Sequence, residues 1–226
     1  LEGAQTIDAT GKHVFPGFID PHVHIHLPFM GTNAIDDHES ATKAALIGGT
    51  TTIIEMICPG PDDEPAKAFA EWKGLAEEGA CCDYTFHLAV VRFDKLAKQQ
   101  LRELVANEGV QSFKIFLAYK GALDISDENL HELMLVCKEL GIVLTAHCEN
   151  AELIDEKQKQ LIAEGKTGPE WHEPSRPRNV EAGGVQHLCE FAEQTGASVY
   201  VVHTSCGEAV ECAMEAKERG VDVTVE

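Results

Sequence analysis

The chain has 226 residues, of which 38 are acidic and 18 are basic, so its formal net charge is -20 at pH 7. Such an excess of negative charge repels a phosphate backbone and argues against nucleic-acid binding. No apolar run approaches the roughly 18 residues of a membrane span, and Leu1 begins no recognisable signal peptide, so we expect a cytoplasmic protein with no membrane partner.

The eight cysteines form no Cys-x-x-Cys pair and show no regular spacing, as expected for thiols that stay reduced. A chain of this length can bury one sizeable core. We therefore look for one main domain.

In chain order, β-branched and apolar runs alternate with helical patterns that begin at capping residues and end at glycines. Strands are predicted over 18–24, 50–56, 84–91, 112–117, 142–147, 198–203 and 221–225. Helices are predicted over 37–48, 62–78, 94–107, 126–140, 151–164, 180–194 and 208–219. The segment 165–177, rich in glycine, proline and charge, is interpreted as a loop and a candidate lid.

Strands that are nearly continuous in apolar residues and separated by helices predict a parallel sheet covered on both faces. An open doubly wound sheet and a closed barrel both satisfy this pattern. Polar residues of ligand type lie toward the carboxyl ends of four strands, and only in a barrel do those four ends converge. They are His22, His24, Lys114, His147 and His203. The prediction is an α/β fold, a TIM-like (β/α)8 barrel that is incomplete, with about seven βα units.

The pair His22 and His24 stands two residues apart, which on a strand places both imidazoles on one face. Neutral imidazoles are good ligands for a metal such as zinc. An isolated His-x-His is more often a pair of polar residues at a strand end. The ligand-type residues at three further strand ends favour a metal site here.

These residues stand in motifs that resemble the cyclic amidohydrolases over nearly the whole chain. The motifs are Pro16-Gly17-Phe18-Ile19-Asp20-Pro21-His22-Val23-His24, Phe113-Lys114-Ile115-Phe116, His147-Cys148-Glu149-Asn150 and Val202-His203. The stretches 27–31, 117–120 and 168–177 look most like the dihydropyrimidinase and hydantoinase branch. The resemblance also assigns residues 1–14 to a remnant of a small N-terminal β-sandwich and its linker, and 15–226 to the barrel.

The resemblance implies a hydrolase with two divalent metal ions, usually Zn2+. His22 and His24 would hold one ion and His147 and His203 the other, while Lys114, carboxylated by carbon dioxide, would bridge both. The reaction would be hydrolysis of a 5,6-dihydropyrimidine or hydantoin ring to an N-carbamoyl amino acid by a metal-bridging hydroxide. Tyr119 would bind substrate by donating a hydrogen bond to the developing oxyanion. The partners implied are a small cyclic amide and, in the intact protein, other copies in a homotetramer.

One expected residue has no counterpart. The family's aspartate after strand eight, which shuttles the proton, is expected beyond residue 226, so no catalytic residue is assigned. We interpret the sequence as a segment of a longer chain and expect the segment alone to be inactive.

Two alternatives stay open, a non-catalytic protein like the collapsin-response mediators and an allantoinase. His26 follows the metal pair where dihydroorotases carry an arginine that holds the substrate's carboxylate, which argues against an acidic substrate. His87, within a predicted strand, is expected to be a hydrogen-bonded core histidine. The particular cyclic amide and the metal are left open.

Overall fold

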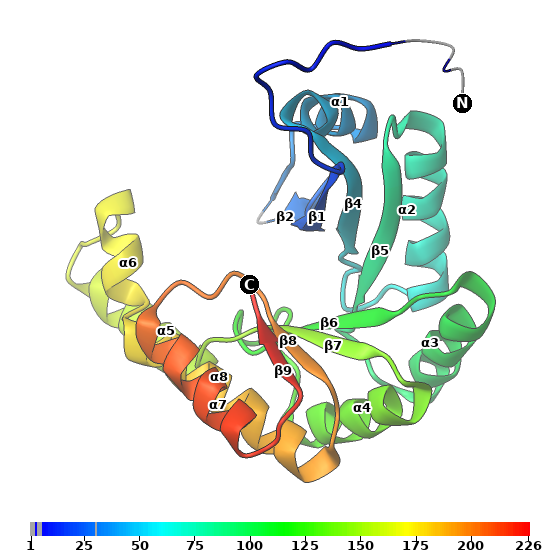
Figure 1. Cartoon of the computed structure of the whole chain (residues 1–226). Coiled ribbons are helices and arrows are strands. Elements are labelled where there is room, and N and C mark those ends of the chain that lie inside the picture. The colour runs from blue at the N-terminus through cyan, green and yellow to red at the C-terminus, as the bar shows by residue number, and fades with distance from the viewer. Residues whose placement is uncertain (1–2, 4–5, 30) are drawn as a thin grey trace.

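The structure is a computed structural model that describes residues 3, 6–29 and 31–226. Its centre is a seven-stranded sheet in the order β1-β4-β5-β6-β7-β8-β9, and every neighbouring pair is parallel (Figure 1). The strands are β1 (Phe18–Val23), β4 (Thr50–Ile57), β5 (Asp83–Ala89), β6 (Ser112–Phe116), β7 (Val143–His147), β8 (Val199–Val201) and β9 (Val223–Val225). A separate antiparallel hairpin joins β2 (Pro28–Phe29) and β3 (Thr32–Asn33).

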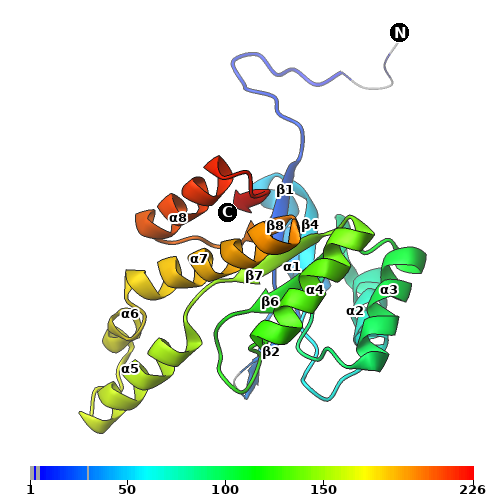
Figure 2. The same ribbon diagram turned by 90° about the horizontal axis from the view of Figure 1, so that it is seen from below.

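The helices surround the outer side of this curved sheet (Figures 1 and 2). They are α1 (His38–Gly48), α2 (Pro65–Gly79), α3 (Lys95–Glu108), α4 (Asp127–Leu140), α5 (Ala151–Ala163), α6 (His172–Ser175), α7 (Arg178–Thr195) and α8 (Gly207–Glu218), with a 3-10 helix η1 (Pro169–Trp171) before α6. Helices α5 and α6 form an arm that extends from the rest of the molecule.

Local signals explain where the helices begin and end. At the start of α4, the side chain of Ser126 accepts a hydrogen bond from the backbone of Asn129, and Gly141 ends the helix in the left-handed conformation. Helix α1 begins in the same way with Asp37 as its cap and ends before Gly49, whose φ is +92°. The boundaries predicted at these residues are confirmed.

The core lies between the sheet and the outer helices. In β6, Phe113 and Ile115 are fully buried in one hydrophobic cluster with Leu130 and Leu133 of α4. Each such leucine stabilises the fold by about 2 kcal/mol. Since successive residues of a strand point to opposite faces, the sequence Phe-Lys-Ile directs Lys114 to the concave face.

The sheet curves strongly toward closure. Its end strands are β1 and β9, yet His22 Nδ1 at the end of β1 lies 3.4 Å from Glu226 Oε1 just after β9. The carboxyl ends of all seven strands therefore surround one region. The predicted incomplete α/β barrel of seven strands is confirmed.

Some details differ from the prediction. The segment 165–177, expected to be a loop, contains η1 and α6, and the hairpin β2–β3 was not predicted. The sixth strand of the barrel ends at Val201, so His203 lies beyond it. The described residues before Phe18 contain no helix or strand, and their assignment to a β-sandwich domain stays a prediction.

Two further findings concern membrane-spanning helices and disulfide bonds. None of the helices of the described residues combines the length and apolar content that a membrane span needs. All eight cysteines are free thiols.

Candidate metal centre

Lys114 lies in the floor of the concave face. Every residue of β6 is buried, and only 1% of the surface of Lys114 is exposed. Burial lowers the pKa of Lys114 to about 8, because a buried ammonium loses its hydration. Its amine forms no salt bridge with any described residue, and a phenyl ring, that of Phe116, lies 5.2 Å away. A larger share of this amine is therefore neutral at pH 7 than in an ordinary lysine.

His22 and His24 meet as predicted, but His24 lies one residue beyond the end of β1 and not within a regular strand. Their Nε2 atoms lie 3.3 Å apart. Strand β1 ends at Val23, and its register with β4 shifts between Asp20 and Val23. Such an irregularity re-aims the side chains that follow it. The pair is thus brought together by an irregular strand end rather than by regular alternation.

His87 of β5 supports this strand end. Its Nε2 donates a hydrogen bond to the carbonyl oxygen of Pro21 at 2.9 Å, and its Nδ1 pairs with the hydroxyl of Ser112. His87 is buried in the sheet, and both of its ring nitrogens have a partner there. The prediction of a hydrogen-bonded core histidine is confirmed, and this histidine anchors the backbone immediately before His22.

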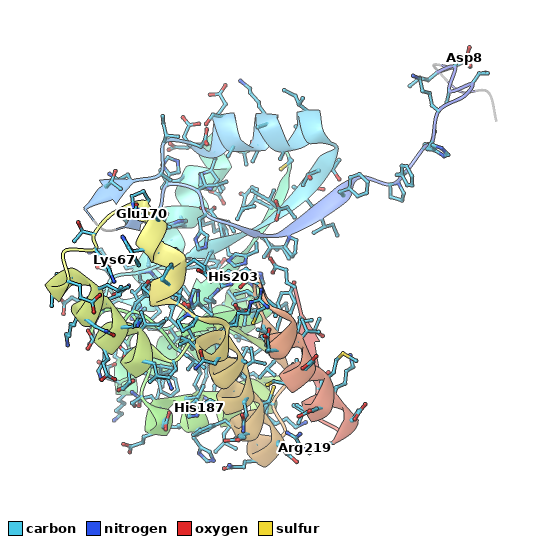
Figure 3. All side chains as sticks on the ribbon, turned by 90° about the vertical axis from the view of Figure 1, so that its left-hand side faces the viewer. Asp8, Lys67, Glu170, His187, His203 and Arg219 are labelled. Carbon is cyan, nitrogen blue, oxygen red and sulfur yellow. The ribbon has the colours of Figure 1, made fainter. Side chains whose placement is uncertain are left out.

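His147 and His203 form the second pair. His147 Nδ1 lies 3.1 Å from His203 Nε2, and the two ring centroids are 4.7 Å apart. The ring of His203 also stacks on that of His22 at 5.3 Å, which joins the two pairs. His203 lies between the N-terminal strand and the C-terminal elements (Figure 3).

The electrostatics of the group favour neutral imidazoles. Burial, followed by the positive charge of Lys114, lowers the pKa of His22 to about 3 and of His24 to about 4. Burial, followed by the neighbouring His147, lowers the pKa of His203 to about 4. These rings keep their lone pairs at neutral pH, the form in which a histidine binds a metal.

The imidazole donors of the described residues are arranged in two pairs. No three His, Cys, Asp or Glu side chains within the described residues form one metal-binding group. The donors are instead two imidazole pairs close to one buried lysine. Imidazole nitrogens together with the oxygens of a carboxylated lysine form a ligand set that zinc and similar ions accept.

Tyr119 follows β6 and lies beside the second pair. Its ring centroid is 5.2 Å from that of His147, and the guanidinium carbon of Arg176 is 5.7 Å from the centre of the tyrosine ring. The side chain is half-buried. The structure thus brings the predicted substrate-binding tyrosine to the predicted metal ligands.

Backbone strain marks the same region. Among the described residues, the non-glycine residues with positive φ are His26 at +53°, Tyr119 at +61° and His203 at +41°. A bulky side chain in this conformation costs about 1–3 kcal/mol, and such residues gather at functional sites. All three follow the carboxyl ends of barrel strands.

Sequence reasoning missed two charged residues here. Glu149 Oε2 lies 2.5 Å from His147 Nε2 and also forms a salt bridge with Arg176. Glu149 stands in the motif His147-Cys148-Glu149-Asn150, and Arg176 stands in the stretch 168–177, so both were within recognised motifs. Nothing in their spacing alone indicated that they meet.

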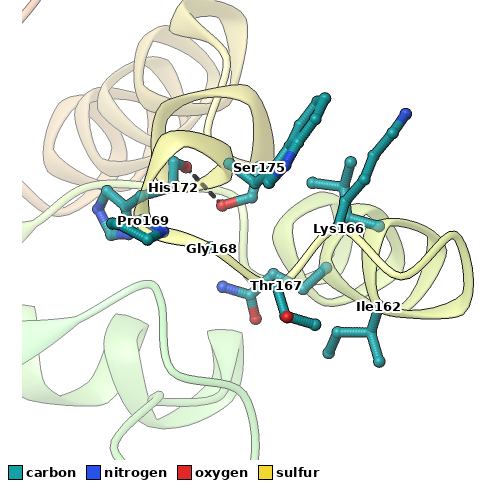
Figure 4. A pocket seen from close by; sticks show the side chains of 10 residues that line it. Ile162, Lys166, Thr167, Gly168, Pro169, His172 and Ser175 are labelled. Carbon is teal, nitrogen blue, oxygen red and sulfur yellow. Dashed lines mark hydrogen bonds between the residues drawn. The ribbon is translucent and has the colours of Figure 1, made fainter.

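A cavity of about 390 Å³ lies elsewhere, between α5 and the η1–α6 segment (Figure 4). Its lining includes Ile162, Lys166 and His172, and it contains none of the predicted site residues. It belongs to the arm rather than to the strand ends, and we assign it no chemistry.

The chain is similar to known proteins over nearly its whole length. The family model described as "Amidohydrolase family" matches residues 13–223. The chain is 40% identical over 221 residues to the D-hydantoinase of Geobacillus stearothermophilus, covering 98% of this chain and 47% of that protein. It is 39% identical over 218 residues to the dihydropyrimidinase of Rattus norvegicus, covering 96% and 42% respectively. The chain thus spans about half the length of these relatives, or slightly less.

Further similar proteins include a dihydropyrimidinase-related protein and two solved hydantoinases. The human dihydropyrimidinase-related protein 5 is 38% identical over 224 residues, covering 99% of this chain and 40% of that protein. A solved D-hydantoinase (dihydropyrimidinase) from Thermus sp. superposes with a TM-score of 0.96 at 56% identity, covering all of this chain and 49% of that one. The L-hydantoinase from Arthrobacter aurescens gives a TM-score of 0.86 at 29% identity with the same coverage.

Proposed function

Because the chain belongs to the amidohydrolase family, we propose that it carries the metal-binding part of a hydrolase that opens a cyclic amide ring. The observation that carries this proposal is the buried Lys114 among four imidazoles in two contacting pairs. A lysine with no salt bridge to the described residues and a lowered pKa has no evident structural purpose there.

In this proposal His22 and His24 would hold one divalent ion, His147 and His203 would hold the other, and carboxylated Lys114 would supply oxygen ligands to both. Zinc is the metal we propose, because borderline nitrogen donors and carboxylate-type oxygens suit it. When bound, the two ions supply Lewis acidity and lower the pKa of a bound water to about 7.

Lys114 must first become a ligand. Its neutral amine attacks carbon dioxide, a nitrogen–carbon bond forms, and one proton leaves the nitrogen, which gives an anionic carbamate. The lowered pKa favours this step, since only the neutral amine is a nucleophile. His22, His24 and His203, whose pKa values burial lowers to about 3 to 4, need no proton transfer before they bind a metal.

Tyr119 would act on the substrate. Its hydroxyl donates a hydrogen bond to the oxygen of the ring carbonyl as negative charge develops there, a contribution of about 3 kcal/mol by analogy with other oxyanion donors. Its position beside His147 supports this role.

We propose a neutral cyclic amide as the substrate, a 5,6-dihydropyrimidine or a hydantoin that opens to an N-carbamoyl amino acid. The names of the relatives support this class, and His26 stands where a carboxylate-binding arginine would be expected for an acidic substrate. We further propose a homotetramer in the cytoplasm. The eight free cysteines are consistent with a reducing compartment.

The test is metal content and ring opening, measured together on the full-length protein rather than on this segment alone, which we expect to be inactive. With zinc and bicarbonate supplied, we expect the protein to bind two ions per chain, and we expect Lys114→Ala to lose them. Lys98→Ala, which removes a half-buried lysine paired with Glu132, is the matched control and should keep both ions. Unchanged metal content in Lys114→Ala would contradict the bridging role.

Activity is assayed on dihydrouracil, hydantoin and allantoin side by side. Turnover of dihydrouracil or hydantoin supports the proposal, whereas preferred turnover of allantoin moves the protein to the allantoinases. Absence of both metal and turnover would place it with non-catalytic relatives.

A further inference from the structure

We propose that Glu149 is a positioning residue that fixes which nitrogen of His147 faces the metal centre, and that Arg176 holds Glu149 and Tyr119 together for this purpose. The inference deepens the proposed function and rests on it, since it assumes that His147 is a ligand.

The hydrogen bond to Glu149 selects one tautomer of His147. A carboxylate only accepts hydrogen bonds, so the 2.5 Å contact with Glu149 Oε2 requires the hydrogen of the neutral ring to lie on Nε2. The Nδ1 atom then keeps its lone pair, and Nδ1 is the atom that lies 3.1 Å from His203 Nε2. The tautomer that Glu149 selects therefore directs the free lone pair toward the other ligand of the same pair.

Helix α7 holds the backbone of Glu149 in place. A Cβ atom added to Gly184 would lie 2.5 Å from the backbone nitrogen of Glu149 and 2.6 Å from the carbonyl carbon of Cys148. The backbone N–H of Asn150 donates to the carbonyl oxygen of Val180 at 3.0 Å. The helix thus contacts both sides of Glu149, and its carboxylate is placed by packing as well as by its own hydrogen bonds.

Arg176 connects this carboxylate to the tyrosine. Its Nη1 pairs with the same Oε2 atom of Glu149 that accepts from His147. Its guanidinium lies over the ring of Tyr119, and its Nε is buried with no hydrogen-bond partner among the described residues. A planar guanidinium can pair with a carboxylate and stack on an aromatic ring at the same time, which a lysine cannot do.

Arg176 directly follows α6. Arg176 therefore connects the segment 165–177 to Glu149 and, through Glu149, to His147. The arm thus contributes to the order of the site through the Arg176–Glu149 pair.

The first measurement is the tautomer of His147 in the metal-free protein, read from 15N chemical shifts of the imidazole. We expect the form with hydrogen on Nε2 in the wild type and a mixture of both forms in Glu149→Ala. Glu132→Ala, which removes an exposed carboxylate from a salt bridge with Lys98, is the matched control and should leave the tautomer unchanged. Circular dichroism establishes that each variant is folded.

The second measurement is a Zn2+ titration against a competing chelator. Loss of a residue that orients a ligand weakens metal binding by about 10–100-fold, so we expect that loss for one of the two ions in Glu149→Ala. Glu149→Gln keeps an acceptor oxygen and should recover part of the affinity. Arg176→Met should weaken the same ion while the other keeps its affinity.

An unchanged tautomer together with unchanged zinc affinity in Glu149→Ala would overturn the inference. If that variant does not fold, wild-type affinity in both Glu149→Gln and Arg176→Met would overturn it equally. If the wild type binds no zinc, the proposed function fails, while the tautomer measurement still decides whether Glu149 positions His147.

Discussion

Tyr119 combines a strained backbone with a hydroxyl that the proposed chemistry needs. We expect Tyr119→Phe to lower kcat by about 10²–10³-fold with little change in KM, since the hydrogen bond to the oxyanion exists only in the transition state. Metal content should stay at the wild-type value, because the phenyl ring still packs against His147.

The matched control for this substitution is Tyr84→Phe, which removes the hydroxyl of a half-buried tyrosine in β5. Its kcat should stay within about two-fold of the wild type, as expected for a change outside the site. An equal loss of kcat in both variants would assign the effect of Tyr119→Phe to packing.

Individual residues show what the sequence could and could not predict about the site. Lys114 was predictable, because a lysine between Phe113 and Ile115 in a buried strand must point to the concave face. The exact ends of the strands could not be predicted. His203 lies two residues beyond β8 with a positive φ, a conformation decided by tertiary contacts rather than by local propensity. Glu149 and Arg176 are 27 residues apart, and a pairing over that separation is decided by the tertiary fold rather than by local spacing.

At the scale of elements, the capping signals and glycine stops predicted the helices well because they act within a few residues. The hairpin β2–β3, η1 and α6 were missed because each is only two to four residues long. Such short pieces carry too little periodicity to be recognised.

Helix α7 provides the sharpest test of packing at this scale. Gly184→Ala places a methyl group against the backbone of Glu149, which cannot move like a flexible side chain, so we expect about 1–3 kcal/mol of destabilisation. Gly183→Ala is the matched control one residue earlier in the same helix, where a Cβ would meet nothing within 4 Å. It should stabilise the protein by about 0.5–1 kcal/mol through helix propensity.

Denaturant unfolding of the two glycine variants gives both values. Loss of zinc affinity in Gly184→Ala but not in Gly183→Ala would link the helix contact to the site. Equal stability of the two variants would contradict the close approach of α7 to the backbone of Glu149.

The contact between α1 and β4 carries a buried titratable pair. His38 Nε2 lies 2.6 Å from Glu55 Oε2, and neither side chain is more than 1% exposed. Burial raises the pKa of Glu55 from 4.5 to about 8 and lowers the pKa of His38 from 6.5 to about 4. Between pH 4 and pH 8 the folded pair therefore holds one proton, whether that proton lies on His38 or on Glu55.

This proton count predicts how stability changes with pH. The unfolded pair also binds one proton between pH 4.5 and 6.5, but none above 6.5, so the folded state binds one more proton there. The free energy of unfolding should fall by about 2 kcal/mol from pH 6.5 to 8, because the folded state binds one more proton over these 1.5 pH units and each unit costs about 1.4 kcal/mol. Glu55→Gln should remove this decline, which urea titrations at pH 6.5 and 8 can measure. The same decline in both proteins would contradict the raised pKa of Glu55.

At the scale of the whole molecule, seven parallel strands bring residues that are up to 181 positions apart, from His22 to His203, into one group of imidazoles. Sequence reasoning reached this arrangement from the pattern of strand ends alone. It follows from topology, since parallel strands must all end on the same side of the sheet.

The net charge of -20 acts on the whole molecule and bears on the class of substrate. A negative field lowers the rate at which an anionic ligand reaches the site, and salt screens that field over a Debye length of about 10 Å at 0.1 M. Neither the negative field nor its screening by salt changes the rate at which a neutral cyclic amide reaches the site.

We therefore expect kcat/KM for dihydrouracil to stay constant between low and high NaCl. We expect kcat/KM for the anion dihydroorotate to be far lower and to rise several-fold with salt. Dihydrouracil in the same buffers is the internal control, because salt effects on folding or metal content would change both substrates. A fall in kcat/KM for dihydroorotate with rising salt would mean that a local cation, such as Arg176, outweighs the field of the whole chain and that acidic substrates belong to the site.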